Sequence, residues 1–394
     1  MRLLFVHDHR FYRDDSGAVY TAGSLPTDVW DRYLAHFDSV QVIGRDGGLL
    51  PRGANFARTS RPGVSFDLVP VQGYGQLIFG PRHIRQRLRR NVEACDAAIV
   101  RLPSELGFMT AAECRKIGKP YAVEVVGCAW DGMRNHGSWF GRIYAPLFFL
   151  RTRRALRKAR LALYVTTKWL QQRYPAGGKS YGASDVEIAP MSDEDLQSRE
   201  ARLARIAAGE LPELGTVASL RIRSKGIQTV LAALEMLRKE GLDLRYRVLG
   251  PGDAAPWIAL AEQHGVADLV SFDGVRPAGE GVRRWLDSVD IHLQPSFQEG
   301  LPRATVEAMS RGAACIGSTC GGIPELLPPE RLHKPGDVAG LAQRIRSLAT
   351  DAAALTHASR QDLGTANDFR PERLAVIRSE FLADLRVRAS TAMP

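Results

Sequence analysis

Short apolar runs alternate with segments of helical periodicity along the whole chain. In the first half, these runs predict strands at RLLFV (2–6), SVQVIG (39–44), SFDLVPV (65–71), AAIVRL (97–102), YAVEVV (121–126) and LALYVT (161–166). In the second half, they predict strands at GTVASL (215–220), LRYRVLG (244–250), LVSFDG (269–274), DIHLQP (290–295) and ACIGS (314–318). Runs of this length, each followed by a helical pattern, are typical of parallel strands joined by crossover helices. The pattern therefore predicts an α/β protein with two similar halves.

A polar, charged stretch without a strand pattern, residues 191–214, separates the halves and predicts a linker with a connecting helix. We expect an N-terminal domain of residues 1–190 and a C-terminal domain of residues 191–370 that includes the linker. The tail at about residues 371–394 has apolar positions at helical spacing and is expected to join the first domain as one amphipathic helix. Ligands of doubly wound sheets bind beyond the carboxyl ends of the strands, so the cleft between the halves is the expected site.

The stretch QEGLPRATVEAM, residues 298–309, places two carboxylates eight positions apart after a predicted strand. Pro302 suits the first residue of a helix, so Glu299 should lie on the loop before that helix and Glu307 within it. Backbone N–H groups at a helix start bind anions. A carboxylate beside a bound phosphate then needs sugar or ribose hydroxyls as partners. Two solvated helix charges are the plain alternative, and the strand-to-helix context argues against it.

The longer stretch PSFQEGLPRATVEAMSRGAACIGSTCGGIPELL, residues 295–327, resembles the E-x7-E signature of retaining GT-B glycosyltransferases, specifically glycosyltransferase family four. The resemblance is strong over about residues 216–327 and weaker elsewhere. It implies a GT-B fold, with two Rossmann-like domains facing a central cleft. It also implies that Glu299 lies beside the transferred sugar and that Glu307 accepts hydrogen bonds from the nucleotide ribose. The donor-binding positions that it adds are Gly300, Leu301 and Pro302.

The stretch ASLRIRSKGIQTVLAAL, residues 218–234, places a basic turn between a strand and a helix. A departing diphosphate needs cations, which makes Lys225 a catalytic candidate and Arg221 or Arg223 its partner. The family usually has an arginine where this chain has Ser219, so the choice between the two arginines stays open. An exposed basic turn is the alternative.

Two further turns match the order of the family's donor-binding motifs. RVLGPGD (247–253) resembles its Gly-rich turn, and SFDGVRP (271–277) resembles the strand end that borders the base. The candidates for the base pocket are Gly274, Val275 and Arg276. The donor is expected to be a nucleotide-sugar, with a UDP-sugar favoured over a GDP-sugar.

The acceptor side resembles the family less closely. Gly17 lies in FYRDDSGAVYTAGSLP, residues 11–26, where the family has a glycine loop after strand one. A surface loop with a helix cap from Asp15 or Ser16 is the alternative. The family often has a histidine after the strand at residues 121–126, and this chain has none there. The remaining acceptor-side candidates are Asp131 and His136. The departing phosphate could accept the acceptor's proton, so a protein base is not obligatory.

The chain has 53 basic and 43 acidic residues and a net charge of +10, which favours anionic partners. Basic residues gather in PRHIRQRLRR (81–90) and, beside aromatic residues, in SWFGRIYAPLFFLRTRRALRKAR (138–160). Such a segment suits a helix on an anionic membrane surface and indicates a lipid-linked or oligosaccharide acceptor. The alternative is that its apolar face is simply core. No nucleic-acid module is recognisable, so no nucleic acid partner is expected.

The longest apolar run, YAPLFFL (144–150), is shorter than the roughly 18 residues of a membrane span, and the N-terminus lacks a signal-peptide pattern. A cytoplasmic protein, peripheral at the inner face of the membrane, is expected. The five cysteines form no metal-ligand pattern, and no Asp-x-Asp pair lies near the donor motif. Neither a metal nor a cofactor is therefore expected.

These features together predict retaining, metal-independent transfer of a sugar from a nucleotide-sugar to a hydroxyl of a lipid-linked glycan, in cell-surface polysaccharide biosynthesis. A GT-B nucleotide-sugar epimerase is an alternative, because it would use the same donor site. A catalytically inactive glycan-binding or nucleotide-sugar-binding subunit is another. The presence of Lys225, Glu299 and Glu307 argues against inactivity.

Overall fold

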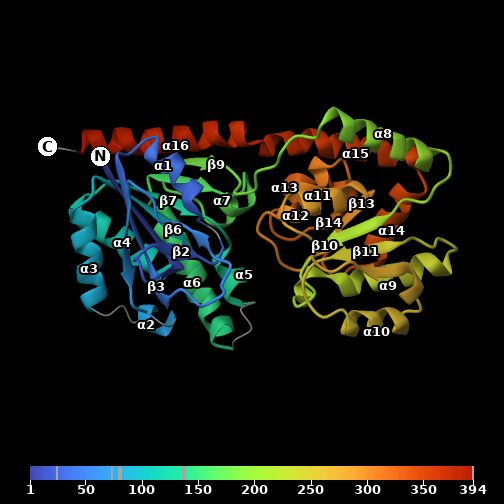
Figure 1. Ribbon diagram of the computed structural model, residues 1–394, viewed down its shortest axis with the longest axis horizontal. Coiled ribbons are helices and arrows are strands. Elements are labelled where there is room, and N and C mark those ends of the chain that lie inside the picture. The colour runs from blue at the N-terminus through green and yellow to red at the C-terminus, as the bar shows by residue number, and fades with distance from the viewer. Residues whose placement is uncertain (24, 72–73, 79–81, 135–138, 393–394) are drawn as a thin grey trace. The chain divides into compact units, whose positions relative to one another are not determined.

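The computed structural model describes residues 1–23, 25–71, 74–78, 82–134 and 139–392 (Figure 1). Contacts divide the chain into two compact units. Unit 1 comprises Met1–Ala183 and Ala375–Pro394, and unit 2 comprises Ser184–Leu374.

Unit 1 contains one sheet, which has nine strands among the described residues. They are β1 (Arg2–Arg13), β2 (Val19–Thr21), β3 (Ser39–Leu49), β4 (Ala57–Arg58), β5 (Val64–Val69), β6 (Ala97–Leu102), β7 (Tyr121–Val125), β8 (Leu161–Tyr164) and β9 (Lys179–Gly182). The parallel strands lie in the order β5-β3-β1-β6-β7-β8-β9, while β2 and β4 extend β1 in antiparallel fashion. The chain order reverses between β1 and β6, which is the topological switch point of this sheet.

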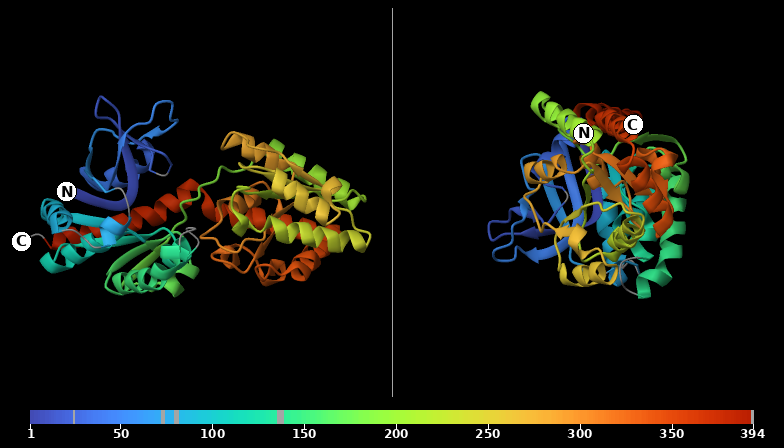
Figure 2. Two further views of the ribbon diagram at one scale, coloured as in Figure 1. Left: turned by 90° about the horizontal axis from the view of Figure 1, so that it is seen from below. Right: turned by 90° about the vertical axis from the view of Figure 1, so that its right-hand side faces the viewer.

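Strand β1 is longer than the apolar run RLLFV predicts. Its first part pairs with β6 up to Val6, and this part is fully buried, as expected of a parallel strand covered on both faces. Its pairing register with β3 shifts after Val6, and the strand continues to Arg13 as a ribbon with β2 and β4. The buried ring of Phe11, 5.3 Å from that of Phe66, holds this ribbon. In the left view of Figure 2 the ribbon, in dark blue, rises from the rest of unit 1.

Helices lie on both sides of the unit 1 sheet, with α6 and α16 on opposite sides (Figure 1). They are α1 (Asp31–Leu34), α2 (Tyr74–Ile78), α3 (Arg82–Glu93), α4 (Glu105–Ile117), α5 (Ala129–Arg134), α6 (Trp139–Arg157), α7 (Trp169–Arg173) and α16 (Pro371–Thr391). The predicted tail helix is α16, and it is anchored on unit 1 by a hydrogen bond of 2.7 Å from the Tyr181 hydroxyl to Asp384.

Unit 2 contains a parallel sheet of six strands in the order β12-β11-β10-β13-β14-β15. They are β10 (Leu214–Val217), β11 (Tyr246–Leu249), β12 (Val270–Phe272), β13 (Ile291–Gln294), β14 (Ala314–Ser318) and β15 (Leu332–His333). The chain order reverses between β10 and β13, so the carboxyl ends of these two strands form the switch point of unit 2.

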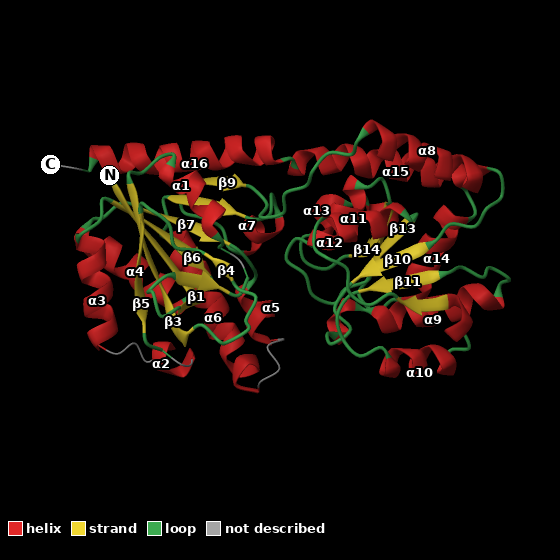
Figure 3. Cartoon of the chain, in the orientation of Figure 1, coloured by secondary structure: helices red, strands yellow, loops and turns green. Residues whose placement is uncertain are grey.

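The helices of unit 2 cover its sheet on both sides, with α8 and α15 on one side and α9 and α10 on the other (Figure 3). They are α8 (Asp193–Ala207), α9 (Ile227–Lys239), α10 (Ala255–Gln263), α11 (Glu280–Asp287), α12 (Arg303–Ser310), α13 (Ile323–Leu326), α14 (Val338–Ala349) and α15 (Ala352–Ala366).

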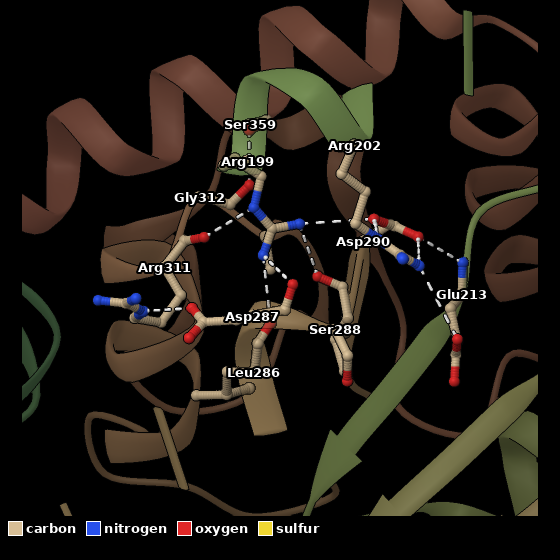
Figure 4. Close-up of polar contacts among 12 residues, drawn as sticks. Arg199, Arg202, Glu213, Leu286, Asp287, Ser288, Asp290, Arg311, Gly312 and Ser359 are labelled. Atoms are coloured by element: carbon tan, nitrogen blue, oxygen red, sulfur yellow. Dashed lines mark hydrogen bonds and ion pairs between the residues drawn. The ribbon is translucent and has the colours of Figure 1, made fainter. Parts of the chain in front are cut away.

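Helix α8 is the connecting helix predicted for residues 191–214, and it is a packed part of unit 2. Its Arg199 is buried and donates to the backbone oxygens of Val289 and Arg311, both at 2.9 Å (Figure 4). One turn further along, Arg202 contacts the carboxylate of Asp290 at 2.5 Å. A buried guanidinium must have its donors satisfied, so these carbonyls fix α8 against the loops of the sheet.

All eleven strands predicted from the apolar runs are confirmed as β1, β3, β5 to β8 and β10 to β14. The predictions omit β2, β4, β9 and β15, which have two to four residues each. Their sequences, VYT, AR, KSYG and LH, contain no apolar run, and this is the signal on which the other predictions rest.

Candidate active site

Lys225 and Glu299 meet at the switch point of unit 2. Lys225 lies in the turn between β10 and α9, and Glu299 lies in the loop between β13 and α12. Because β10 and β13 are neighbours, the two loops leave the sheet side by side. The Lys225 Nζ lies 2.7 Å from the Glu299 Oε1, and the exposed fractions of the two side chains are 27% and 9%. The predicted cation and the predicted carboxylate thus form one partly shielded ion pair.

Two side chains that the sequence analysis did not assign hold the Glu299 carboxylate. Gln294 Nε2 and Ser296 Oγ both donate to its Oε1 at 2.8 Å. Both residues are buried, because Gln294 ends strand β13 and Ser296 follows it. Among the described residues, all three hydrogen bonds to the carboxylate end on Oε1. Oε2 is therefore left for a further donor.

Glycines set the close approach of the loops around the ion pair. Gly226, with a φ of +83°, lies where a Cβ would come within 2.1 Å of the Pro295 carbonyl oxygen. Gly321, with a φ of +60°, lies where a Cβ would come within 2.2 Å of the Glu299 carbonyl oxygen. A backbone hydrogen bond of 2.7 Å from Gly322 to Gly300 joins the same loops. Only glycine fits such positions, so Gly226 and Gly321 fix where Lys225 and Glu299 lie.

The helix predicted to begin at Pro302 begins one residue later. Pro302 is the N-cap residue, in an extended conformation with a ψ of 115°, and α12 starts at Arg303. No side chain caps this helix start. The preceding Gly300 and Leu301 are partly buried. The first N–H groups of α12 therefore have no side-chain acceptor, and such groups bind anions.

Glu307 lies on the second turn of α12 and is separate from the ion pair. Its side chain is 25% exposed, and Arg303 Nη1 approaches its Oε1 to 3.7 Å. Burial raises the pKa of Glu307, and the nearby Arg303 opposes this effect. Glu299 and Glu307 thus occupy different environments. The carboxylate of Glu299 is held by a lysine and two neutral donors, whereas that of Glu307 is half-buried beside the exposed side chain of Arg303.

The structure brings neither candidate arginine to the ion pair. The Arg223 guanidinium lies over the Trp257 ring, 5.7 Å from its centre, and Arg221 is exposed. Both line a pocket of about 410 Å³ beside α10. Ser219, at the family's usual arginine position, hydrogen-bonds to the Pro251 carbonyl at 3.3 Å. Which arginine partners Lys225 stays open.

The two Gly-rich turns of unit 2 lie together, at the carboxyl ends of β11 and β12. Gly250 N–H donates to the Gly274 carbonyl at 2.7 Å. The following Val275 is 63% exposed. Arg276 lines a pocket of about 800 Å³ together with Arg247, Trp285 and Ser288. Of the three candidates, Arg276 therefore lines a cavity large enough for a ligand, and Gly274 and Val275 precede it in the chain without lining that cavity.

The acceptor-side candidates are scattered over unit 1. Gly17, with a φ of +83°, lies in the turn from β1 to β2, beyond the last residue of β1 that pairs with β6. Asp14 accepts hydrogen bonds from the N–H groups of Ser16 and Ala18 in this turn. The turn leads into a strand and not into a helix, so the alternative of a helix cap from Asp15 or Ser16 is wrong. The other candidates are Asp131, which lies in the first turn of α5, and His136, which falls outside the described residues.

Three residues at the switch point of unit 1 were not found from the sequence. In VHDHR, directly after the buried part of β1, Asp8 accepts from the N–H groups of Glu105 (2.6 Å) and Leu106 (3.0 Å) at the start of α4. His7 and His9 flank it. Burial lowers the pKa of His9 to about 4, and the charge of Arg101 adds to this effect. Imidazoles, absent directly after β7, are thus present within β1, and the available signal was that polar residues directly follow its apolar run.

Two absences hold for the part of the chain that the structure describes. No helix in the described ranges is both long enough and apolar enough to cross a bilayer. No three His, Cys, Asp or Glu side chains among the same residues gather where they could hold a metal ion. Metal-independent transfer stays a prediction.

The two Rossmann-like units, each with a topological switch point, define the class of protein: an α/β protein of the GT-B fold. Residues 212–351 match the family described as Glycosyl transferases group 1. Over 350 residues the chain is 31% identical to Protein CapJ of Staphylococcus aureus, covering 88% of this chain and 85% of that protein. The chain therefore belongs to the group 1 glycosyltransferase family.

Two further comparisons agree with this assignment. The amylovoran biosynthesis glycosyltransferase AmsK of Erwinia amylovora is 34% identical over 139 residues, which are 33% of this chain and 34% of that protein. The crystal structure of Alr3699/HepE from Anabaena in complex with UDP superposes with a TM-score of 0.65 at 16% identity, covering 98% of this chain and all of that one. At that identity the likeness concerns the fold alone.

Proposed function

We propose that this protein is a retaining glycosyltransferase that moves a sugar from a UDP-sugar to a hydroxyl of a lipid-linked glycan, in the assembly of a cell-surface polysaccharide. The observation that carries the proposal is the ion pair of Lys225 and Glu299 at the switch point of unit 2. The complexes of HepE with UDP and with UDP-glucose support the choice of donor. The name of AmsK, an amylovoran biosynthesis glycosyltransferase, supports a role in polysaccharide assembly.

Lys225 and the start of α12 bind the diphosphate of the donor. The bond from the sugar's anomeric carbon to the diphosphate breaks, and negative charge develops on the departing phosphate. A lysine ammonium and uncapped backbone N–H groups stabilise that charge more than they stabilise the ground state, which is the condition for catalysis. Arg221 or Arg223 would add a second cation after a change of side-chain conformation.

Glu299 positions the sugar. Its Oε1 is held by Lys225, Gln294 and Ser296, so its Oε2 accepts from a sugar hydroxyl, with the amides of Gly300 and Leu301 beside it. A fixed carboxylate also stabilises positive charge on an oxocarbenium-like transition state. The acceptor oxygen bonds to the anomeric carbon on the face that the diphosphate leaves, and the departing phosphate takes the acceptor's proton.

Glu307 binds the ribose, and the turn of Gly274, Val275 and Arg276 borders the base. A half-buried carboxylate accepts two neighbouring hydroxyls without a metal ion, which fits a ribose. On the acceptor side, Gly17 and Asp131 remain candidates, together with His7 and His9. The +10 net charge and the basic segments support a peripheral position on the anionic, cytoplasmic face of a membrane.

The test combines donor binding with product analysis. UDP and UDP-sugar binding is measured by calorimetry, and transfer is measured as UDP release with a lipid-linked acceptor. The anomeric configuration of the product is then read by NMR. A product of retained configuration supports the proposal if the wild type forms it and Glu299→Gln does not. A product of inverted configuration overturns the retaining mechanism.

The alternatives give different products. An epimerase releases a free isomeric nucleotide-sugar when no acceptor is present. An inactive binding subunit binds the donor but releases no UDP above background, with or without acceptor.

A further inference from the structure

Helix α6 has one buried face and one exposed apolar face. The segment was predicted either to contact a membrane or to supply core residues, and it does supply core: Tyr144 and Phe148 are buried in unit 1. Other large apolar side chains of the same helix are exposed, namely Trp139 (74%), Ile143 (67%), Leu147 (50%) and Leu150 (59%). Their spacing of four, four and three residues places them on one side of the helix. We call these residues the apolar stripe.

The apolar stripe continues directly into cations. Arg154 follows Leu150 by four residues and Arg157 follows by seven, so both lie on the same side of α6, and Lys158 comes next in the chain. All three are exposed. Within the ranges that the structure describes, none of their side chains forms an ion pair or a hydrogen bond. The exposed side of α6 is thus apolar at its N-terminal end and cationic at its C-terminal end.

A small basic pocket lies beside this cationic end. It has a volume of about 200 Å³ and is lined by Phe108, Arg115, Arg151, Arg154, Ala155 and Lys158, from α4 and α6 and the turn after α6. Arg151 is neutralised by Glu105, which its two terminal nitrogens contact at 2.7 and 2.8 Å. Arg115 bonds to the hydroxyl of Tyr121 at 3.1 Å and not to a carboxylate. The pocket therefore keeps the charge of Arg115, Arg154 and Lys158.

The size and charge of the pocket select its occupant. Pockets for whole small ligands measure roughly 300–1,000 Å³, so this one fits a group such as a phosphate and not a sugar or a base. Arginines bind phosphate oxygens with paired N–H groups. A nucleic acid would satisfy the cations but would leave the apolar stripe in water, and exposed apolar patches mark protein or membrane contacts. A phosphate that carries hydrocarbon chains satisfies both features.

We propose that this pocket binds the phosphate group of a membrane lipid while the apolar stripe of α6 enters the lipid layer beside it. The inference rests on the proposed function, in which the acceptor is lipid-linked, and it names the surface that receives the lipid. Amphipathic helices bind anionic membranes in this way, through buried apolar area together with attraction to the headgroups. Here the apolar and cationic parts lie end to end, so the N-terminal part of α6 enters more deeply than the C-terminal part.

The experiment is co-sedimentation of the full-length protein with vesicles. The vesicles contain phosphatidylcholine alone, or with phosphatidate or phosphatidylserine at equal mole fraction. Arg154→Gln with Lys158→Gln should weaken binding to phosphatidate vesicles about thirty-fold, since each cation near the surface contributes about 1 kcal/mol. The matched control is Arg386→Gln with Arg388→Gln, two exposed arginines on α16, on the opposite side of the unit 1 sheet. Equal losses in the two double variants would overturn the proposal.

A second pair of variants tests the apolar stripe. Leu147→Ser with Leu150→Ser removes apolar area from exposed positions, so the fold should be kept, as circular dichroism would verify. This variant should bind both kinds of anionic vesicle more weakly than the wild type does. If this variant binds vesicles as well as the wild type does, the apolar stripe does not enter the lipid layer. If the protein binds inorganic phosphate but no vesicle of any composition, the proposal that the phosphate group belongs to a membrane lipid is wrong.

Calorimetric binding of UDP to every variant separates this inference from the proposed function. The donor site lies in unit 2, so UDP binding should equal that of the wild type throughout. A wild type that binds phosphatidate vesicles but no UDP or UDP-sugar contradicts the proposed function and leaves the lipid site standing. If the protein transfers sugar and the double variant Arg154→Gln with Lys158→Gln binds phosphatidate vesicles as well as the wild type does, the lipid site alone is contradicted.

Discussion

Gly226 lies so close to Pro295 that a Cβ on the glycine would come within 2.1 Å of the proline's carbonyl oxygen. This approach joins the turn that carries Lys225 to the loop that carries Glu299. A hydrogen bond of 2.8 Å from Phe297 N–H to the Ser224 carbonyl holds the same two segments. The ion pair of the candidate site is therefore set by backbone packing as well as by charge.

Gly226→Ala should damage both stability and donor binding. The alanine would meet a φ of +83° and the Pro295 carbonyl, and we expect a loss of about 3 kcal/mol or more in the free energy of unfolding. Gly241→Ala is the matched control, because Gly241 has a φ of +82° with no atom within 4 Å of the added Cβ. The control should lose only about 1 kcal/mol, the cost of the left-handed conformation. Urea unfolding measures both losses, and equal values would contradict the packing argument.

Lys225→Gln and Glu299→Gln should affect different steps. Loss of the ammonium removes charge from the diphosphate site, so Lys225→Gln should weaken UDP binding about tenfold and lower kcat as well. Glu299→Gln should lower kcat by about a hundredfold or more while UDP binding changes little. Lys239→Gln is the control, because Lys239 pairs with Glu235 at 2.6 Å on the exposed side of α9 in the same unit. Full transfer activity in both site variants would sink the assignment.

The sequence could indicate Glu299 and Lys225 as site candidates because both lie in contiguous motifs at the ends of apolar runs. It could not predict that Gln294 and Ser296 hold Glu299, because those contacts depend on the exact path of the loop after β13. Likewise, the need for glycine at Gly226 and Gly321 arises from approach between segments distant in the sequence. The eleven strands could be predicted because each contains a run of apolar residues. The ribbon formed by β1, β2 and β4 depends instead on pairing between short, partly exposed strands.

Glu307→Gln should separate stability from binding. Burial raises the pKa of Glu307 above its value in the unfolded chain, so the ionised carboxylate costs stability, and this cost appears as the pH rises through that interval. At neutral pH the glutamine variant should thus be as stable as the wild type or more stable. It should nevertheless bind UDP about tenfold more weakly, because it loses charged hydrogen bonds to the ribose.

The control for this prediction is Glu262→Gln, an exposed position on α10. It should change neither the free energy of unfolding nor the affinity for UDP. Urea unfolding at neutral pH and calorimetry with UDP measure both quantities. Unchanged UDP affinity in Glu307→Gln would remove Glu307 from the donor site.

Unit 2 should lose stability in weak acid through His292, a buried residue of β13. Burial lowers the pKa of His292 from 6.5 to about 4, and its Nε2 lies 3.3 Å from Gln294 Oε1, next to the site. Between these two values the unfolded chain binds a proton that the folded chain does not, so stability falls as the pH falls from 6.5 towards 4. By pH 5, His292 alone should cost about 2 kcal/mol.

His292→Leu removes this proton uptake and should make the loss of stability between pH 7 and pH 5 smaller by that amount, whatever the variant's stability at pH 7. Unfolding in urea is monitored by hydrogen exchange of the β13 and β14 amides, so that the measured free energy of unfolding is that of unit 2. Other histidines of the unit, such as His333, titrate alike in both proteins and cancel in the difference. An equal loss in the wild type and the variant would show that His292 can be protonated in the folded state. The polar chain from His292 through Gln294 to Glu299 would then be more open to water than its burial indicates.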